Sequence, residues 1–250
     1  MGLEFEVTFV ILSLDPLKVM DRILGLSSIG PYDLVFEKEL VFTDRYFDTH
    51  SGELMDQRLG LRLRQSENTG LICMKDAGKT SAFGGIKRTE IEGPWTGEAM
   101  DIILDALRER GIIRDSTPCN LSGISDSAGF LYGLGLHIIQ KRETIRQITK
   151  VLYHQVPVAR IDLDTVRYQA DKAEILHHEM EIELKDAQEE THLERLAGLF
   201  EERFYNELMP WGINKLLTGF ALESMYKKGM IQGSQPDRHI YEEIMDMGIT

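Results

Sequence analysis

Hydrophobic and polar residues alternate along several stretches of the chain, beginning near its N-terminus. In residues 3–9 the odd positions are apolar, and the even positions Glu4, Glu6 and Thr8 are polar. Successive side chains of a β-strand point to opposite faces, so this spacing places the polar side chains together on one face. The stretch is predicted to be a half-buried strand.

Five further stretches with strand character gather charged residues in the same way. Their charged positions, two or four apart, are Arg62/Arg64, Arg88/Glu90/Glu92, Arg142/Arg146, Arg160/Asp162/Asp164 and Glu179/Glu181/Glu183/Lys185. One such strand is an ordinary solvated face, and cross-strand salt bridges on solvated faces are an alternative for the whole set. Several strands that carry both carboxylates and cations favour a charged face lining an enclosed site. Carboxylates suit hard divalent cations, and Arg and Lys suit phosphate oxygens, so this site would hold both.

Helices are predicted where a capping residue precedes apolar residues at helical spacing. The predicted N-cap residues of these helices are Asp15, Thr96, Asp186 and Asn214. Residues 116–135 are read as a long connection that holds a short helical piece. His177 and His178 are expected at a sheet edge and not as a pair of ligands.

About eight strands, with helices inserted at a few points, indicate the α+β class and an antiparallel barrel or sandwich. The two series of strands have similar character and no linker divides them. One domain is therefore predicted for residues 1–229, followed by a peripheral tail of residues 230–250.

Composition narrows the classes of function. The chain has 250 residues, 42% of them hydrophobic, and a formal net charge of −13. This acidic total argues against binding to nucleic acids or anionic membranes, whereas cations inside the predicted strands favour a small polyanion. No apolar run approaches the roughly 20 residues of a membrane-spanning helix. The start at Glu4 and Glu6 is unlike a secretory leader, so the cytoplasm is expected, where Cys73 and Cys119 would stay reduced.

The charged stretches resemble, in order, the motifs of the CYTH superfamily, the triphosphate tunnel metalloenzymes. Glu4-Phe5-Glu6-Val7-Thr8 is similar to the Glu-x-Glu-x-Lys signature of that family. The other matches are Tyr46-Phe47-Asp48-Thr49, Leu61-Arg62-Leu63-Arg64, Lys75, Arg88-Thr89-Glu90, Lys141-Arg142, Asp164-Thr165-Val166, Glu179 to Leu184, and Lys215. Each motif is weak alone, but the ordered set covers nearly the whole chain.

The resemblance implies a closed antiparallel β-barrel of about eight strands that forms a tunnel, with helices packed outside. It also implies metal-dependent hydrolysis of a triphosphate with Mg²⁺ or Mn²⁺. The implied metal ligands are Glu4, Glu6, Glu90, Asp164, Glu179, Glu181 and Glu183. The implied substrate-binding residues are Arg62, Arg64, Lys75, Arg88, Arg142, Arg146 and Lys215, with Lys141 as the alternative if residues 136–148 face inward with the other parity. Glu4, Glu6, Lys75 and Arg88 are the expected catalytic residues.

One position departs from the family pattern, because Thr8 stands where the signature lysine belongs. The leading hypothesis is a triphosphatase acting on inorganic triphosphate or a small organic triphosphate such as thiamine triphosphate. The alternatives are a class IV-like adenylyl cyclase and a phosphate- or polyphosphate-binding protein with weakened catalysis, which Thr8 favours. A small-molecule triphosphate is the expected partner, and an oligomer is left open.

Overall fold

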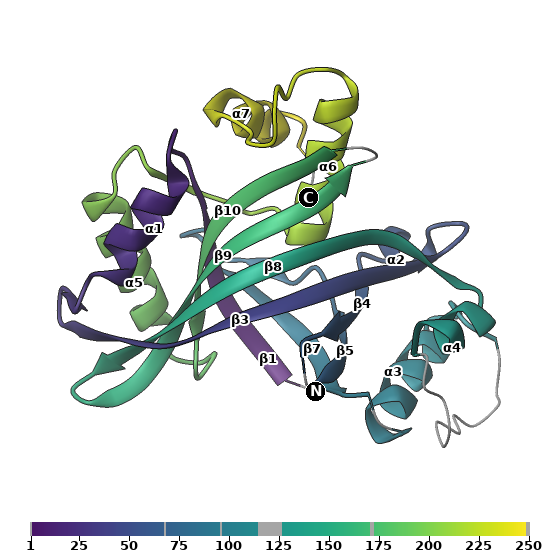
Figure 1. Ribbon diagram of the computed structural model, residues 1–250. Coiled ribbons are helices and arrows are strands. Elements are labelled where there is room, and N and C mark those ends of the chain that lie inside the picture. Colours follow the sequence, from purple (N-terminus) through teal and green to yellow (C-terminus); the bar gives the residue numbers. More distant parts are fainter. Residues whose placement is uncertain (1, 68, 96, 115–126, 171–172, 249–250) are drawn as a thin grey trace. The chain divides into compact units, whose positions relative to one another are not determined.

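The computed structural model describes residues 2–67, 69–95, 97–114, 127–170 and 173–248, which contain both strands and helices (Figure 1). The strands are β1 Gly2–Ile11, β2 Ser28–Ile29, β3 Tyr32–Thr49, β4 Gly60–Gln65, β5 Gly70–Lys75, β6 Lys79–Thr80, β7 Ile86–Pro94, β8 Leu136–Tyr153, β9 Val156–Ala170, β10 Ala173–Leu184 and β11 Leu208–Pro210. The helices are α1 Pro16–Leu24, α2 Glu53–Asp56, α3 Gly97–Glu109, α4 Ser127–Gly133, α5 Glu190–Arg203, α6 Lys215–Lys227 and α7 Arg238–Asp246.

The strands pair in the order β11-β1-β10-β9-β8-β3-β4-β5-β7-β6, and β2 pairs with β3. Strand β1 also pairs with β7, so the eight strands β1, β10, β9, β8, β3, β4, β5 and β7 form a ring of hydrogen-bonded neighbours. This pairing confirms the predicted α+β class with an eight-stranded antiparallel arrangement.

The chain contains two compact units. Unit 1 consists of Met1–Leu3, Phe42–Gly78 and Arg88–Arg142, and unit 2 consists of Glu4–Val41, Lys79–Lys87 and Glu143–Thr250. Each unit has its own apolar cores, which follow directly from the alternation along its strands.

In unit 1 the apolar positions of the strands pack under helices α3 and α4. Leu61 and Leu63 of β4 and Ile72 and Met74 of β5 alternate with charged or thiol side chains and join one buried cluster. Helix α3 contributes Met100, Ile103, Leu104 and Leu107 to this cluster, and α4 contributes Ala128 and Leu131. The charged positions of the same strands therefore face away from these helices.

In unit 2 a first core lies between the sheet and helices α1 and α5, which run side by side (Figure 1). It contains the odd-numbered residues Phe5, Val7 and Phe9 of β1, as the alternation predicted. The other members from neighbouring strands and helices include Ile161, Leu163, Met180, Ile182, Met20, Leu193 and Phe200. The even-numbered residues of β1 point to the opposite face of the sheet.

A second core of unit 2 holds helices α6 and α7. Its strand residues Val10, Val166 and Ile175 have the same parity as Glu6, Asp164 and Glu179 on β1, β9 and β10. The register between these strands is continuous, so α6 and α7 pack on the sheet face that carries the charged side chains. The first residue of α6, Lys215, is thereby brought beside those charges.

Two of the four predicted helix starts agree with the structure. The Asp15 side chain accepts a hydrogen bond from the Lys18 backbone amide, and Asn214 accepts from the amides of Leu216 and Leu217. The predicted start at Asp186 was wrong, because α5 begins at Glu190 and Asp186 instead accepts from Gln188 in a turn. The predicted N-cap Thr96 lies outside the described residues, as do Cys119 and residues 115–126 of the predicted connection.

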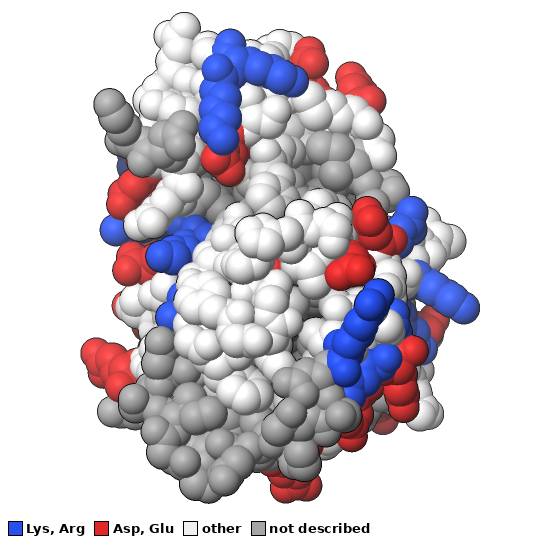
Figure 2. Space-filling view, turned by 90° about the vertical axis from the view of Figure 1, so that its right-hand side faces the viewer, with Lys and Arg blue, Asp and Glu red and all other residues white. Residues whose placement is uncertain are grey.

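None of the helices within the described ranges is both long and apolar enough to span a lipid bilayer. On the face shown in Figure 2, basic and acidic side chains are interspersed, with uncharged surface between them. Residues 230–250 were expected to form a peripheral tail, and within them Ile240, Tyr241 and Ile244 of α7 are buried in the second core of unit 2. The division of the chain at residue 229 stays a prediction.

Candidate active site

The charged face of unit 1 is built by alternate residues of five strands. Strand β4 contributes Arg62 and Arg64, and β5 contributes Cys73 and Lys75. Strand β3 contributes Asp44 and Tyr46, β7 contributes Arg88, Glu90 and Glu92, and β8 contributes Arg142. Cross-strand register places Asp44 opposite Arg64, Tyr46 opposite Arg62, and Arg62 opposite Cys73. The spacing of two that was seen in the sequence is therefore what gathers these side chains.

Asp44 is the centre of a cluster of three arginines. Its carboxylate accepts a bidentate pair of hydrogen bonds from Arg64, with Nε to Oδ1 at 2.8 Å and Nη2 to Oδ2 at 2.9 Å. Arg142 donates from Nη2 to Oδ2 at 3.1 Å, and Arg62 lies 3.8 Å from the same oxygen. Asp44 and the Arg142 side chain are fully buried. One carboxylate thus balances part of the charge of three guanidinium groups.

The charges around Asp44 overcome the effect of its burial. Burial would raise the pKa of the Asp44 carboxyl, but Arg62, Arg64 and Arg142 together hold that pKa well below its usual range. Tyr46 belongs to the same cluster, because its hydroxyl accepts from Arg142 Nη2 at 2.6 Å. The guanidinium of Arg142 also lies over the Tyr46 ring, 4.6 Å from its centroid.

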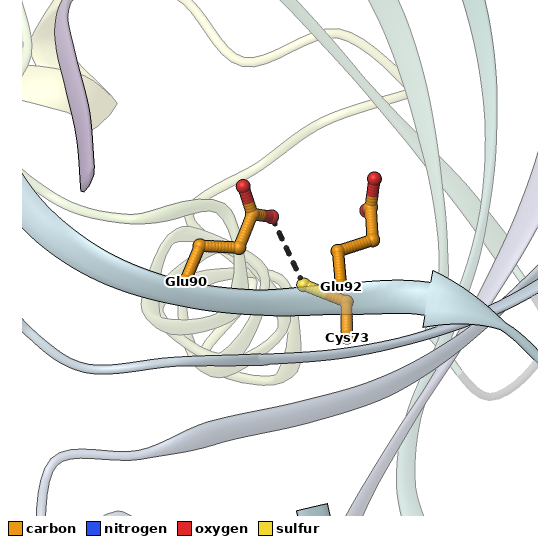
Figure 3. Close-up of side chains that lie close together, drawn as sticks. All are labelled: Cys73, Glu90 and Glu92. Atoms are coloured by element: carbon orange, nitrogen blue, oxygen red, sulfur yellow. Dashed lines mark hydrogen bonds between the residues drawn. The ribbon is translucent and has the colours of Figure 1, made fainter. Parts of the chain in front are cut away.

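Cys73, Glu90 and Glu92 form a second group on this face (Figure 3). The Cys73 thiol donates to Glu90 Oε1 at 3.1 Å. Both carboxylates already have cationic neighbours, since Lys75 lies 3.1 Å from Glu90 and Arg62 lies 3.6 Å from Glu92. A metal ion at this group would have to compete with these two side chains.

The Cys73 thiol is expected to resist alkylation in the folded protein. Burial raises its pKa to about 12, which leaves almost no thiolate at pH 8, and the side chain is fully buried. Iodoacetamide should modify Cys73 at least about a hundredfold more slowly than in urea-unfolded protein. Peptide mass spectrometry can follow this position separately from Cys119, and comparable rates in the two states would contradict the expectation.

The structure also shows where the remaining predicted residues of unit 1 lie. Arg88 is half-buried in β7. On β8, Arg142 is buried and Lys141 is exposed, which is the parity preferred from the sequence. Asp48 of the Tyr-Phe-Asp-Thr motif accepts from the backbone amides of Thr49, Leu54 and Met55. Asp48 therefore holds the start of α2 in place and does not join the charged cluster.

In unit 2 three carboxylates from neighbouring strands come together. Glu4 and Glu6 of β1 and Glu183 of β10 each offer an oxygen atom, and these atoms lie within 4.8 Å of one another. Glu6 and Glu183 are direct cross-strand partners. Glu4 and Glu6 are buried, and Glu183 accepts from Arg160 at 2.6 Å. Three carboxylates at this spacing are the kind of oxygen donors that Mg²⁺ and Mn²⁺ prefer.

A second acidic group, Asp164, Glu179 and Glu181, surrounds the ammonium of Lys215. Lys215 Nζ lies 3.3 Å from Asp164 Oδ2 and makes close ion pairs with Glu179 and Glu181. Burial would lower the pKa of Lys215, but the three carboxylates raise it well above its usual value. Lys215 therefore stays charged.

Arg146 is another cation of unit 2, and it is buried. It donates to Asp164 at 2.7 and 2.6 Å, to Asp162 at 2.5 Å and to Glu181 at 2.7 Å. Burial would lower its pKa, but these carboxylates raise it well above the usual value. Among the described residues of this face, carboxylates from β1, β9 and β10 accompany the cations Arg146, Arg160 and Lys215.

His177 and His178 were expected at a sheet edge. Both are buried and pair with β9, and the pairing of β10 with β1 ends at Glu179. His177 has the same parity as Glu179 and contacts its carboxylate, with Nε2 and Oε2 2.9 Å apart. His178 points to the other face and contacts the Thr165 hydroxyl at 3.1 Å. Burial, helped by His177, lowers the pKa of His178 to about 4.

Thr8 lies on the charged face of unit 2, between Glu6 and Val10 of β1. Its cross-strand partner is Glu181, which is already paired with Arg146 and Lys215. The carboxylate opposite Thr8 is thus balanced by cations from β8 and α6.

The structure therefore places most of the predicted residues on one charged face in each unit, and exposed Lys141 lies outside them. Residues that were not selected as site residues also belong to these faces, among them Asp44, Asp162 and His177. Asp162 and His177 could have been found by their parity, since each lies two residues from a selected carboxylate, Asp164 or Glu179, whereas Asp44 has no selected neighbour on β3.

Comparison with known proteins identifies the family. Residues 23–208 match the CYTH domain model, so the chain belongs to the CYTH domain family. A comparison with curated protein sequences found no match. Glu4, Glu6, Lys215 and all of α6 and α7 lie outside the matched range.

Solved structures share the fold. A candidate adenylyl cyclase from Hippeastrum, described as having a dominant triphosphatase activity, has 16% sequence identity and a TM-score of 0.53, and the alignment covers 92% of this chain and 97% of that chain. A candidate adenylate cyclase from Bacillus halodurans has 20% identity and a TM-score of 0.53, with 87% and 98% of the two chains covered. At these identities the likeness establishes the fold.

Proposed function

We propose that this protein is a metal-dependent triphosphatase that acts on inorganic triphosphate or a small organic triphosphate. The observation that carries the proposal is the group of Glu4, Glu6 and Glu183, three carboxylates from two paired strands in a chain of the CYTH family. The triphosphatase activity described for the structural neighbour from Hippeastrum supports the same reaction.

The donor set at Glu4, Glu6 and Glu183 fits a hard divalent cation. All three donors are carboxylates, which suit Mg²⁺ or Mn²⁺. Such an ion, when bound, neutralises phosphate charge and activates water. The further ligands inferred from family resemblance, Glu90, Asp164, Glu179 and Glu181, already contact Lys75 or Lys215.

The cations of unit 1 are proposed to bind the phosphate oxygens. Arg62, Arg64 and Arg142 present planar guanidinium groups, which match phosphate oxygens in bidentate fashion, while Lys75 and Arg88 add further positive charge. Asp44 and Tyr46 hold these arginines in fixed orientations. Fixed cations stabilise the charge that develops on the phosphate oxygens and the leaving group without having to reorganise during the reaction. Arg146 and Lys215 are proposed to contribute in the same way from unit 2.

A phosphate-release assay tests the proposal directly. Purified protein is incubated with inorganic triphosphate, thiamine triphosphate or ATP, in Mg²⁺, in Mn²⁺ and in EDTA. We expect orthophosphate from at least one triphosphate, and only when the metal is present. No turnover with any of the three would overturn the proposal, and cyclic AMP with pyrophosphate from ATP would show a cyclase instead.

Thr8 favours the second candidate, a triphosphate-binding protein without turnover, because a cation of the family signature is missing there. The surroundings of Thr8 argue that the loss is compensated, since Glu181 is already paired with Arg146 and Lys215. Calorimetry separates the two functions, because binding of triphosphate without release of orthophosphate would identify the binding protein.

Thr8→Lys is expected to change kcat/KM for the preferred triphosphate by less than about tenfold. The new ammonium would enter a place where the facing carboxylate already has two cationic partners. Thr8→Ser serves as the control for a change of size alone. A gain of a hundredfold or more in Thr8→Lys only would show that Thr8 marks a loss of catalysis.

The proposal also includes the binding partner and the location of the protein. A small-molecule triphosphate is the proposed partner, with neither nucleic acid nor membrane required, and the cytoplasm is the proposed location.

A further inference from the structure

A chain of hydrogen bonds joins the C-terminal helix to the acidic group around Lys215. The Tyr241 hydroxyl of α7 lies 2.9 Å from His177 Nδ1, and His177 Nε2 lies 2.9 Å from Glu179 Oε2. The other oxygen of Glu179, Oε1, contacts the Lys215 ammonium. His177, Glu179 and Tyr241 are buried within unit 2, with His177 at 0% and Glu179 at 1% exposure, and the Lys215 side chain is 10% exposed.

The geometry defines a direction for the chain. An ionised Glu179 can only accept, so the Nε2–H of His177 donates to it, and in the neutral imidazole Nδ1 accepts from the Tyr241 hydroxyl. That hydroxyl keeps its proton, because burial raises the pKa of Tyr241 well above the usual value. The Tyr241 hydroxyl therefore determines which ring nitrogen of His177 carries the proton. The hydrogen-bond partners of metal-bound histidines fix the tautomer in the same way.

Both ends of the chain are anchored in the second core of unit 2. Trp211 packs edge-on against the Tyr241 ring at 5.5 Å and donates to Thr218 of α6 at 2.9 Å. Helix α6 is fixed at its start by Asn214, and the Lys215 carbonyl accepts from the Tyr168 hydroxyl at 2.8 Å. The backbone of Lys215 and the ring of Tyr241 are thus held by the same packing.

We propose that Tyr241, His177 and Glu179 position the Lys215 ammonium, and that Glu179 serves as the anchor of this internal cation instead of as a metal ligand. Each Glu179 oxygen already has its own partner, one in His177 and one in Lys215. The proposal deepens the proposed function, on which it rests for Lys215 as a substrate-binding cation. It makes α7, which lies beyond the range matched by the family model, a part of the site.

Three variants test the chain without relying on turnover. His177→Gln can still donate to Glu179, His177→Leu cannot, and Tyr241→Phe keeps the ring but loses the hydroxyl. Tyr205→Phe is the control, because Tyr205 is 77% exposed. Circular dichroism and urea unfolding identify any variant that fails to fold, and Tyr241→Phe keeps the test valid if His177→Leu does not fold.

The first measurement is the binding of Mn²⁺ without any triphosphate, which electron paramagnetic resonance can monitor. If Glu179 anchors Lys215, the Mn²⁺ dissociation constant stays within about twofold of wild type in Glu179→Gln and in Tyr241→Phe. If Glu179 is a metal ligand, its replacement weakens Mn²⁺ binding by about tenfold or more. That weakening would overturn the proposal.

The second measurement is the rate at which an amine-acylating reagent labels Lys215, read by peptide mass spectrometry with Lys75 as the internal reference. We expect Lys215 labelling to rise at least about fivefold relative to Lys75 in His177→Leu and Tyr241→Phe, and to stay near wild type in His177→Gln and Tyr205→Phe. A general loosening of the structure would raise the labelling rates of Lys215 and Lys75 together. An unchanged ratio of the two rates in Tyr241→Phe would overturn the proposal.

These two measurements test the role of Glu179 independently of the proposed triphosphatase function. If wild-type protein releases no phosphate from any triphosphate, the triphosphatase assignment fails, while Mn²⁺ binding and Lys215 labelling still decide the role of Glu179. If turnover is present, kcat/KM should fall by about tenfold in His177→Leu and recover in His177→Gln. A loss of the same size in both variants would contradict the donor role of His177.

Discussion

Glu6→Gln should reduce metal-dependent phosphate release by at least about a hundredfold, since even residues that support a metal ligand indirectly cost 10- to 100-fold when replaced. Glutamine keeps the size of the side chain but removes the negative charge that a divalent cation needs. Glu6 lies opposite Glu183 in the strand pairing and is buried, so bulk water compensates little for the lost charge. Initial rates at saturating Mg²⁺ or Mn²⁺ measure the effect.

The matched control for this substitution is Glu174→Gln, which changes an exposed carboxylate on β10 of the same unit. It should leave the rate unchanged. The Mn²⁺ dissociation constant should rise in Glu6→Gln and stay constant in Glu174→Gln. Full activity of Glu6→Gln at low metal concentration would place the metal elsewhere in the protein.

Asp44→Asn is expected to lower the free energy of unfolding by about 3–5 kcal/mol, the usual cost of removing one partner from a buried ion pair. Asp44 is fully buried and balances Arg62, Arg64 and Arg142. An amide removes the negative charge and turns one acceptor into a donor, which would face guanidinium donors. Urea unfolding at neutral pH measures the loss.

Asp101→Asn, an exposed substitution on α3 of the same unit, is the control and should change the free energy of unfolding by less than about 0.5 kcal/mol. Because Asp44 supplies an anion to three arginines, added triphosphate should stabilise Asp44→Asn more than wild type. A loss below 1 kcal/mol for Asp44→Asn would show that the arginines do not depend on Asp44.

Strand alternation was the most reliable signal in the sequence. Phe5, Val7 and Phe9 enter a core while Glu4, Glu6 and Thr8 share the opposite face, because the side-chain period of a strand leaves no other arrangement. Capping residues also predicted local structure where the side chain could reach a free amide, as at Asp15 and Asn214.

The residues that were missed depend on contacts between strands far apart in sequence. Asp44 is flanked at spacing two by Phe42 and Tyr46, so its strand shows no run of charges, and its three arginine partners come from β4 and β8. The burial of His177 involves Val166 of β9 and Tyr241 of α7, and local pattern alone cannot place either beside it. Asp186 was chosen by its spacing to Glu189, but the turn it forms delays the helix to Glu190.

Four of the five boundaries between the two units fall inside strands. They lie between Leu3 and Glu4 in β1, Val41 and Phe42 in β3, Lys87 and Arg88 in β7, and Arg142 and Glu143 in β8, and the fifth lies between Gly78 and Lys79 at the start of β6. Each unit is assembled from three separate pieces of chain, so no single proteolytic cut or truncation would release one of them intact. A split of the chain at any of the four positions inside strands would therefore interrupt a strand.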